Sequence, residues 1–204
     1  MSLTGIILAA GSSTRMGRPK QLLPLGERCL LQHVVDEALR SQLDDVVIVL
    51  GARADEIRAV IALPATGRAR IVVNPDHAAG QSTSLRAGLA AAGARARGVA
   101  VLLGDEPGVR AEVIDRVADV FEGGDAPIVR PIYVVDGRTV PGHPVILARS
   151  IWPELETLRG DRGARALWLA HPEWLRDMPI EGEPPPDVDT EAAYRRVVRD
   201  CSEG

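Results

Sequence analysis

The chain alternates short apolar runs with segments in which apolar residues recur every three or four positions. The apolar runs predict buried strands, at residues 6–10, 46–50, 71–73 and 99–103. The periodic segments predict helices, over residues 30–40, 55–62, 82–92 and 111–122. Strands that are apolar on both faces and alternate with helices are typical of a parallel sheet covered on both sides. The right-handed crossover rule then predicts a three-layer, doubly wound α/β fold with a mostly parallel sheet.

The pattern changes after residue 125. Residues 127–135 and 143–148 predict two strands of a hairpin around the turn at Asp136-Gly137-Arg138. Further elements are predicted beyond it: a helix over 164–170, a strand near 174–178, a loop at 181–186 and a closing helix over 190–199 whose N-cap is Thr190. We therefore expect one domain over residues 1–204, with a small β-hairpin insertion.

Composition narrows the class of protein. Hydrophobic residues make up 46% and charged residues 25% of the chain, which is ordinary for a globular protein. The net charge of −4, without a basic run interleaved with aromatics, argues against a nucleic-acid binder. Cys29 and Cys201 form neither a CxxC pair nor a metal-binding spacing, and the first apolar run is too short to cross a membrane. We expect a soluble cytoplasmic protein that binds neither nucleic acid nor membranes.

A loop without acidic residues follows the first predicted strand. After Ala10 the chain reads GSSTRMGRPK over residues 11–20. In an open α/β sheet, ligands bind beyond the carboxyl ends of the strands, where this loop begins. Its small residues let a ligand approach the backbone, and its N–H groups, with Arg15 and Lys20, suit a phosphate chain. The alternative is a surface turn with helix-capping serines and solvated arginines.

Two common phosphate-binding loops do not fit this stretch. A Walker A motif needs GxxxxGK[ST], but Gly17 is followed by RPKQ, and a Rossmann loop needs a further glycine between Gly11 and Gly17. The longer pattern LAAGSSTRMGRPK, residues 8–20, resembles the signature loop of nucleotidyltransferases that transfer NMP from an NTP and release pyrophosphate. It is most similar to the branch that contains molybdenum cofactor cytidylyltransferase. The resemblance implies catalytic roles for Arg15 and Lys20 in neutralising the triphosphate. It also implies nucleotide contacts by Leu8, Ala9, Ala10, Gly11, Ser12 and Lys20.

Two acidic segments are candidates for a metal site. Asp105, in the sequence GDEP, follows a predicted strand, and a carboxylate there beside a triphosphate suits Mg²⁺. Asp187 and Asp189, in PDVDT, alternate and therefore point to the same side of an extended segment. The alternatives are a turn residue and a helix cap. The resemblance implies that Asp105 and Asp189 hold Mg²⁺, for which Mn²⁺ can substitute.

The segment GQSTSLRAGL begins a predicted helix at residues 80–89. Ser82 and Ser84 could cap this helix. The resemblance places the segment beside the base and ribose, which implies nucleotide contacts by Gly80, Ser82, Ser84 and Asp105. The family often has an aromatic residue where His77 stands, so the role of His77 stays open.

Two later motifs resemble the acceptor side of the molybdopterin branch. They are Gly142-His143-Pro144 and GDRGAR at residues 160–165. The second is a glycine-hinged turn with two arginines that leads into a helix, which suits an anionic phosphate. Read without the family, both arginines are solvated charges. The resemblance implies these acceptor-binding residues: Glu106, Pro107, Gly142, His143, Pro144, Asp161, Arg162 and Arg165.

The expected activity follows from these parts. We expect transfer of CMP from CTP to the phosphate of molybdopterin or its molybdenum-loaded form, with release of pyrophosphate. Residues 1–125 would bind the donor and 126–204 the acceptor, and a molybdenum hydroxylase would receive the product. Cytidine is favoured by the family pattern, because guanylyl-transferring relatives tend toward LAGG and Ala10 gives LAAG here. Two alternatives stay open: a cytidylyl- or uridylyltransferase for a sugar or polyol phosphate, and a non-catalytic protein that delivers the molybdenum cofactor.

Overall fold

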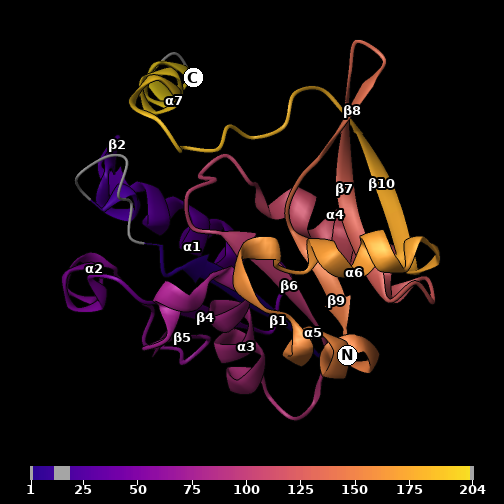
Figure 1. Cartoon of the computed structure of the whole chain (residues 1–204). Coiled ribbons are helices and arrows are strands. Elements are labelled where there is room, and N and C mark those ends of the chain that lie inside the picture. Colours follow the sequence, from indigo (N-terminus) through magenta and orange to yellow (C-terminus); the bar gives the residue numbers. More distant parts are fainter. Residues whose placement is uncertain (1, 12–18, 203–204) are drawn as a thin grey trace.

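A mixed eight-stranded sheet forms the centre of the molecule (Figure 1). The computed structural model describes residues 2–11 and 19–202. The strand order is β10-β7-β9-β6-β1-β4-β5, and β8 pairs with β7. The strands are β1 (Ser2–Ala9), β4 (Asp45–Leu50), β5 (Ala69–Val73), β6 (Ala96–Leu103), β7 (Ile128–Val135), β8 (Arg138–Pro141), β9 (Val145–Ala148) and β10 (Leu175–Glu181). The predicted mostly parallel α/β fold is confirmed.

The two strands at the middle of the sheet end together. β1 is parallel to both β4 and β6, and Leu8 is paired with Leu103. The chain then turns away from both strands at one edge, where the Gly104 N–H donates to the Leu8 carbonyl over 3.0 Å. A Cβ on Gly104 would lie 2.9 Å from that of Ala9, so glycine is needed for this close approach. Ligand-binding loops therefore begin side by side at this edge.

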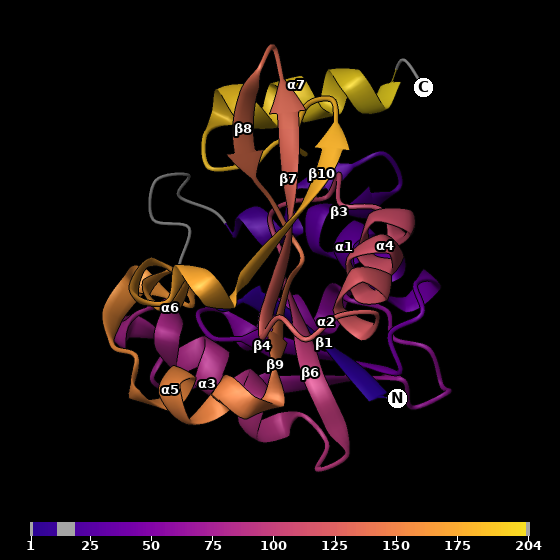
Figure 2. The same ribbon diagram turned by 90° about the vertical axis from the view of Figure 1, so that its right-hand side faces the viewer.

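Helices cover both faces of the sheet (Figure 2). α1 (Leu30–Arg40) and α4 (Ala111–Glu122) lie on one face, with α2 (Ala54–Val60) at its edge, and α3 (Gln81–Ala91), α5 (Trp152–Thr157) and α6 (Arg165–Ala170) lie on the other. A hydrophobic core lies on each face of the sheet. Successive residues of β1 contribute to both, because Ile7 packs on the face of α1 and α4 and Ile6 on the face of α3, α5 and α6. Both side chains are fully buried. Within the described ranges, no helix combines the length and apolar character that a membrane span requires.

The C-terminal segment crosses the carboxyl edge of the sheet. After β10 the chain runs back over the molecule to α7 (Glu191–Ser202), as Figure 1 shows. α7 packs on a small hairpin of β2 (Pro24–Leu25) and β3 (Arg28–Cys29). The Tyr194 hydroxyl donates to the Pro24 carbonyl over 2.6 Å. The Ala193 N–H donates to the Thr190 hydroxyl over 3.2 Å, so the predicted N-cap is confirmed.

The hairpin prediction was wrong in its second strand. β7 pairs across the turn with β8, not with β9, and Val135 is opposite Arg138. Asp136 and Gly137 both have a positive φ, which suits a two-residue turn that starts the next strand at once. β9 instead lies between β6 and β7, antiparallel to both. All four residues of β8 are exposed, so it lacks the apolar run by which the other strands were predicted.

Candidate functional site

A cavity of about 480 Å³ opens at the carboxyl ends of β1 and β6. Its walls come from the end of β1, the turn at Lys20, the start of α3 and the turn after β6. Eight of the predicted nucleotide-binding residues line it: Leu8, Ala9, Ala10, Gly11, Lys20, Gly80, Ser84 and Asp105. Ser12 and Arg15 lie outside the described residues.

Lys20 lies among carboxylates at this cavity. Its Nζ forms an ion pair with Asp105 and another with Asp189, whose Oδ1 is 2.7 Å away. Burial alone would lower the pKa of the Lys20 ammonium, but Asp105 and Asp189 outweigh this effect and raise that pKa above its usual value. The lysine is therefore held as a cation at a place where phosphate oxygens could reach it.

Three carboxylates converge around this lysine. Asp105, Asp187 and Asp189 each have an oxygen within 4.8 Å of the others. The Val188 N–H donates to the Asp105 carbonyl over 3.1 Å, and the Val188 side chain is fully buried. Since side chains alternate in extended chain, the acids on either side of Val188 lie on the same side of the segment, as the sequence predicted. The structure brings Asp187 close to Asp105 and Asp189, the two acids that were expected to bind metal.

The donor set fits a hard divalent cation. Burial and the charges of Asp105 and Asp189 raise the pKa of Asp187 to about 7, so these acids repel one another. Lys20 offers a single positive charge against them. Mg²⁺ and Mn²⁺ prefer oxygen ligands, and such an ion would relieve this repulsion. Asp105, Asp187 and Asp189 are therefore the residues that would hold the metal.

The start of α3 interlocks with the GDRGAR turn. A Cβ on Gly80 would lie 2.5 Å from the carbonyl carbon of Gly160, so the two backbones are in close contact. Asp161 Oδ1 accepts a hydrogen bond from the Gln81 N–H over 3.2 Å, which places a carboxylate at the helix N-terminus. Asp161, assigned by resemblance to the acceptor side, lines the cavity of about 480 Å³ described above.

The two serines of α3 have different surroundings. Ser84 lines the cavity and its hydroxyl accepts a hydrogen bond from Asn74 Nδ2 over 3.0 Å. Ser82 is fully buried and does not line the cavity, and its hydroxyl has no hydrogen-bond partner among the described residues. Positions two apart on an α-helix point about 200° apart, so both serines cannot face one ligand. Of the two predicted nucleotide contacts, only Ser84 lies at the cavity.

A second cavity of about 210 Å³ adjoins the first. The two share Leu8, Gln81 and Leu103 as walls. His143 and Arg165, both predicted to bind the acceptor, line the smaller one. Four other predicted acceptor residues line neither of the two: Glu106, Pro107, Gly142 and Pro144. The side chain of Arg162 lies outside the described part of the chain.

Glu106 is buried beside the smaller cavity. Both of its carboxylate oxygens lie 3.0 Å from His143 Nδ1. Tyr133 packs over Gly142, where its ring carbon would be 2.5 Å from an added Cβ. Burial, together with the negative charge of Glu106, raises the pKa of Tyr133. The Glu106 carboxylate is therefore largely shielded from solvent, with the His143 imidazole as its hydrogen-bond partner.

Three residues of the larger cavity were missed or left open by the sequence. Gln21 is buried, and its Nε2 donates to the carbonyls of Ala9 (3.1 Å) and Gly11 (3.2 Å), which fixes the start of the loop. An amide just before two leucines was its only signal in the sequence. Gln81 lines both cavities. His77 also lines the larger one, which gives it a place but no assigned chemistry.

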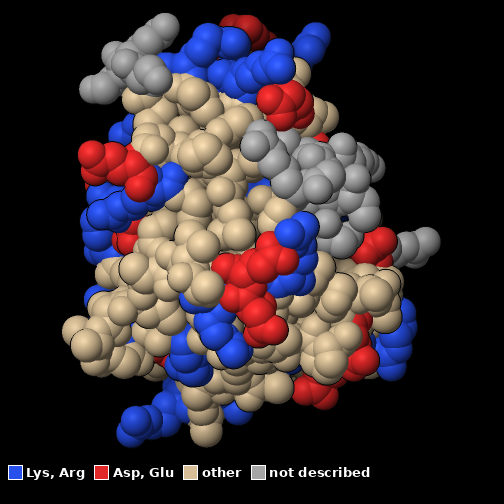
Figure 3. Space-filling view, turned by 90° about the vertical axis from the view of Figure 1, so that its left-hand side faces the viewer, with Lys and Arg blue, Asp and Glu red and all other residues tan. Residues whose placement is uncertain are grey.

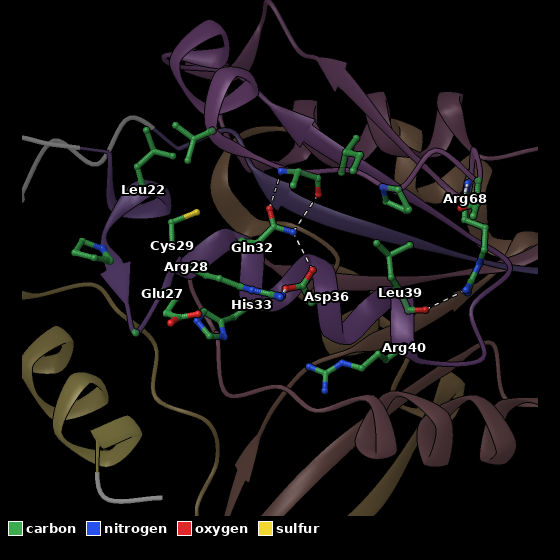
Figure 4. A pocket seen from close by; sticks show the side chains of 17 residues that line it. Leu22, Glu27, Arg28, Cys29, Gln32, His33, Asp36, Leu39, Arg40 and Arg68 are labelled. Carbon is green, nitrogen blue, oxygen red and sulfur yellow. Dashed lines mark hydrogen bonds and ion pairs between the residues drawn. The ribbon is translucent and has the colours of Figure 1, made fainter.

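A larger hollow of about 1250 Å³ lies on the outer side of α1 (Figure 4). Several of its polar side chains form hydrogen bonds within the protein. Gln32 bonds both the N–H and the carbonyl of Ala62, and Arg68 donates to the Leu39 carbonyl over 3.0 Å. Among the described residues, the one group of three or more potential metal ligands is at Asp105, not here. We therefore place the functional site at the carboxyl ends of β1 and β6.

Acidic and basic side chains are interspersed on the face in Figure 3, with basic ones gathered at the top, where α7 lies. Arg195, Arg196 and Arg199 of α7 are exposed. Arg195 pairs with Glu191 over 3.5 Å and Arg196 with Glu183 over 2.9 Å. Two of these three arginines are thus paired with nearby acids.

Comparison with known proteins gives the same picture. A family model described as the MobA-like NTP transferase domain matches residues 5–174. Nicotine blue oxidoreductase of Paenarthrobacter nicotinovorans is 36% identical over 202 residues, which cover 95% of each chain. Molybdenum cofactor cytidylyltransferase of Escherichia coli (strain K12) is 27% identical over 71% of this chain and 69% of its own length.

Solved structures match over nearly the full chain. The crystal structure of Rv0371c from Mycobacterium tuberculosis H37Rv superposes with a TM-score of 0.84 at 34% identity, covering 98% of both chains. The same protein in complex with manganese gives a TM-score of 0.80. The family match spans the loop after β1 and Asp105, and it ends before Asp187 and Asp189, the other two acids of the cluster. The chain therefore belongs to the MobA-like NTP transferase domain family.

Proposed function

We propose that this protein transfers CMP from CTP to the phosphate of molybdopterin, or of its molybdenum-loaded form, and releases pyrophosphate. One observation carries the proposal. Lys20 and Asp105 line a cavity together with the small-residue end of β1, and Asp187 and Asp189 lie beside Asp105. This combination suits a metal-bound triphosphate, with a second cavity beside it for an acceptor.

Nucleotidyl transfer needs no covalent protein intermediate. An acceptor phosphate oxygen forms a bond to the α-phosphorus while the bond to pyrophosphate breaks, so catalysis rests on positioning and on charge. A divalent cation held by the three acids would supply positive charge at the triphosphate. Lys20 donates to phosphate oxygens, and the small residues at Ala9–Gly11 let the phosphate chain approach the backbone.

The proposed donor rests on Ala10 and on the family pattern. Ala10 lines the larger cavity, in keeping with the LAAG pattern of the cytidylyl-transferring relatives. The test is pyrophosphate release with each of the four NTPs, measured with and without molybdopterin and across a panel of sugar and polyol phosphates. The proposal predicts release with CTP and molybdopterin together. If pyrophosphate is released only with a sugar or polyol phosphate, that compound is the acceptor and molybdopterin is not. If none of the four NTPs yields pyrophosphate, a delivery protein is favoured.

The oxidoreductase name of one relative favours a second candidate function. That relative is 36% identical over 95% of the chain, so oxidoreductase activity is tested alongside transfer. The two activities make different demands on the acid cluster, because hydride transfer from a nicotinamide needs no divalent cation. We expect Asp189→Asn to abolish pyrophosphate release. A NAD(P)H-consuming activity that survives in Asp189→Asn would support the oxidoreductase instead.

A further inference from the structure

Two successive acids that follow β6 pair with groups at different cavities. Asp105 forms its ion pair with Lys20 at the larger cavity. The next residue, Glu106, turns to His143, which comes from the chain before β9 and lines the smaller cavity. One tight turn therefore positions Asp105 at the larger cavity and, through Glu106, His143 at the smaller one. The role of Glu106 is separate from metal binding.

The turn holds the Glu106 carboxylate in place. The Glu106 N–H donates to the Leu103 carbonyl over 3.3 Å, and its own carbonyl accepts from the Val109 N–H over 3.2 Å. Glu106 is only 9% exposed, so its carboxylate needs a hydrogen-bond partner from the protein. His143 Nδ1 lies 3.0 Å from both oxygens and is positioned to supply that partner.

This contact decides how the imidazole of His143 is presented. A carboxylate only accepts hydrogen bonds, so Nδ1 must carry the proton that it donates to Glu106. In the neutral ring, Nε2 then carries the lone pair. Among the described residues, no hydrogen-bond partner is recorded for this Nε2, and His143 forms part of the cavity wall.

We infer that Glu106 is a positioning residue that acts through His143. Glu106 fixes the Nδ1–H tautomer and the orientation of the ring, so that Nε2 accepts a hydrogen bond from an N–H or O–H group of the acceptor. Leu8, Leu103 and Trp168 give the cavity apolar walls, and Arg165 adds a cation. The occupant is thus an acceptor with an apolar body, a hydrogen-bond donor and an anionic group. Its identity as a transfer acceptor rests on the proposed function, whereas the tautomer does not.

The tautomer can be measured without substrate. We expect the ¹⁵N-histidine NMR spectrum of the whole protein, recorded at about pH 8.5 where histidine is normally neutral, to show a protonated Nδ1 and an unprotonated Nε2 for His143. The signal is assigned by its loss in His143→Gln. Glu106→Gln keeps an acceptor oxygen and should keep the tautomer, whereas Glu106→Leu should lose it. A protonated Nε2 in the wild type would overturn the inference, even if Glu106→Leu does not fold.

A double-mutant cycle tests the functional part. We expect Glu106→Leu and His143→Ala each to raise KM for the acceptor about tenfold while KM for CTP stays unchanged. The double variant should be no worse than His143→Ala alone, because Glu106 acts through the ring. Additive losses, or an equal rise in KM for CTP, would contradict this role.

The chain offers a matched control for the cycle. His171 Nδ1 lies 3.3 Å from Glu173 Oε1, but this pair is on the surface and outside both cavities. We expect Glu173→Leu to leave both KM values and the His143 spectrum unchanged. If no nucleotide transfer is found with any acceptor, the proposed function fails while the NMR result still decides the tautomer.

Discussion

Lys20 is the one lysine in the sequence, and it lies between two carboxylates. All other basic side chains apart from histidine are arginines, whose planar fork differs from the compact ammonium group. A compact cation can sit between Asp105 and Asp189 and still donate to a phosphate. The site therefore places one ammonium group among three acids. A bound metal ion would add positive charge and reduce the repulsion among the acids.

Loss of that ammonium should remove charge stabilisation from the triphosphate. We expect Lys20→Ala to lower kcat/KM for CTP on the order of 10²- to 10³-fold, and Lys20→Arg to recover only part of it. Steady-state pyrophosphate release measures both. Arg40→Ala is the control, because Arg40 lies on α1 and pairs with Glu37 away from this cavity. Near-normal turnover in Lys20→Ala would show that the lysine is not part of the machinery.

The raised pKa of Asp187 predicts a pH dependence of stability. Its pKa of about 7 in the fold exceeds the ordinary 3.8, so the folded state retains a proton between these values that the unfolded state has lost. The free energy of unfolding must therefore fall as pH rises through this window. In metal-free protein with a chelator, we expect Asp187→Asn to have a higher Tm than the wild type at about pH 8, with the gap closing toward about pH 4. A difference in Tm between Asp187→Asn and the wild type that stays the same at all pH values would contradict the raised pKa of Asp187.

Elements with an apolar signature could be predicted from the sequence. α1 and α4 have the predicted bounds, whereas β1, β4 and β6 begin about one to four residues before the predicted strands, and β1 ends one residue earlier than predicted. β8 could not be predicted because all its residues are exposed, and β2 and β3 are too short to show a pattern. The pair of Glu106 and His143 is 37 residues apart in sequence, and no local pattern reveals such a contact.

Packing of α3 on the GDRGAR turn should depend on glycine at position 80. Gly80 has a φ of 109°, and an added Cβ would lie 2.5 Å from the backbone of Gly160. We expect Gly80→Ala to lower the free energy of unfolding on the order of 2 kcal/mol and to weaken CTP binding, since the cavity wall must shift. Gly93→Ala is the matched control, because nothing lies within 4 Å of its Cβ position. Chemical denaturation of both variants measures the difference, and equal stabilities would contradict the close packing.

The whole molecule brings distant segments to one edge of the sheet. Asp105 follows β6, whereas Asp187 and Asp189 arrive on the C-terminal segment that crosses that edge. The sequence predicted that Asp187 and Asp189 face the same side, because alternation is local. Their meeting with Asp105 depends on the buried Val188 and its backbone bond, which only the fold shows. The proposed donor and acceptor parts of the chain thus both contribute acids to one cluster.

The central claim is that these acids and Lys20 bind a divalent cation and a nucleoside triphosphate together. The most direct measurement is isothermal titration calorimetry of CTP into the protein with Mg²⁺, with Mn²⁺ and with a chelator. The account predicts that CTP binds tightly only when a divalent cation is present, and that Asp105→Asn and Asp189→Asn remove the metal-dependent part of the binding. CTP binding that is equally tight in the chelator, or unchanged in both variants, would contradict it.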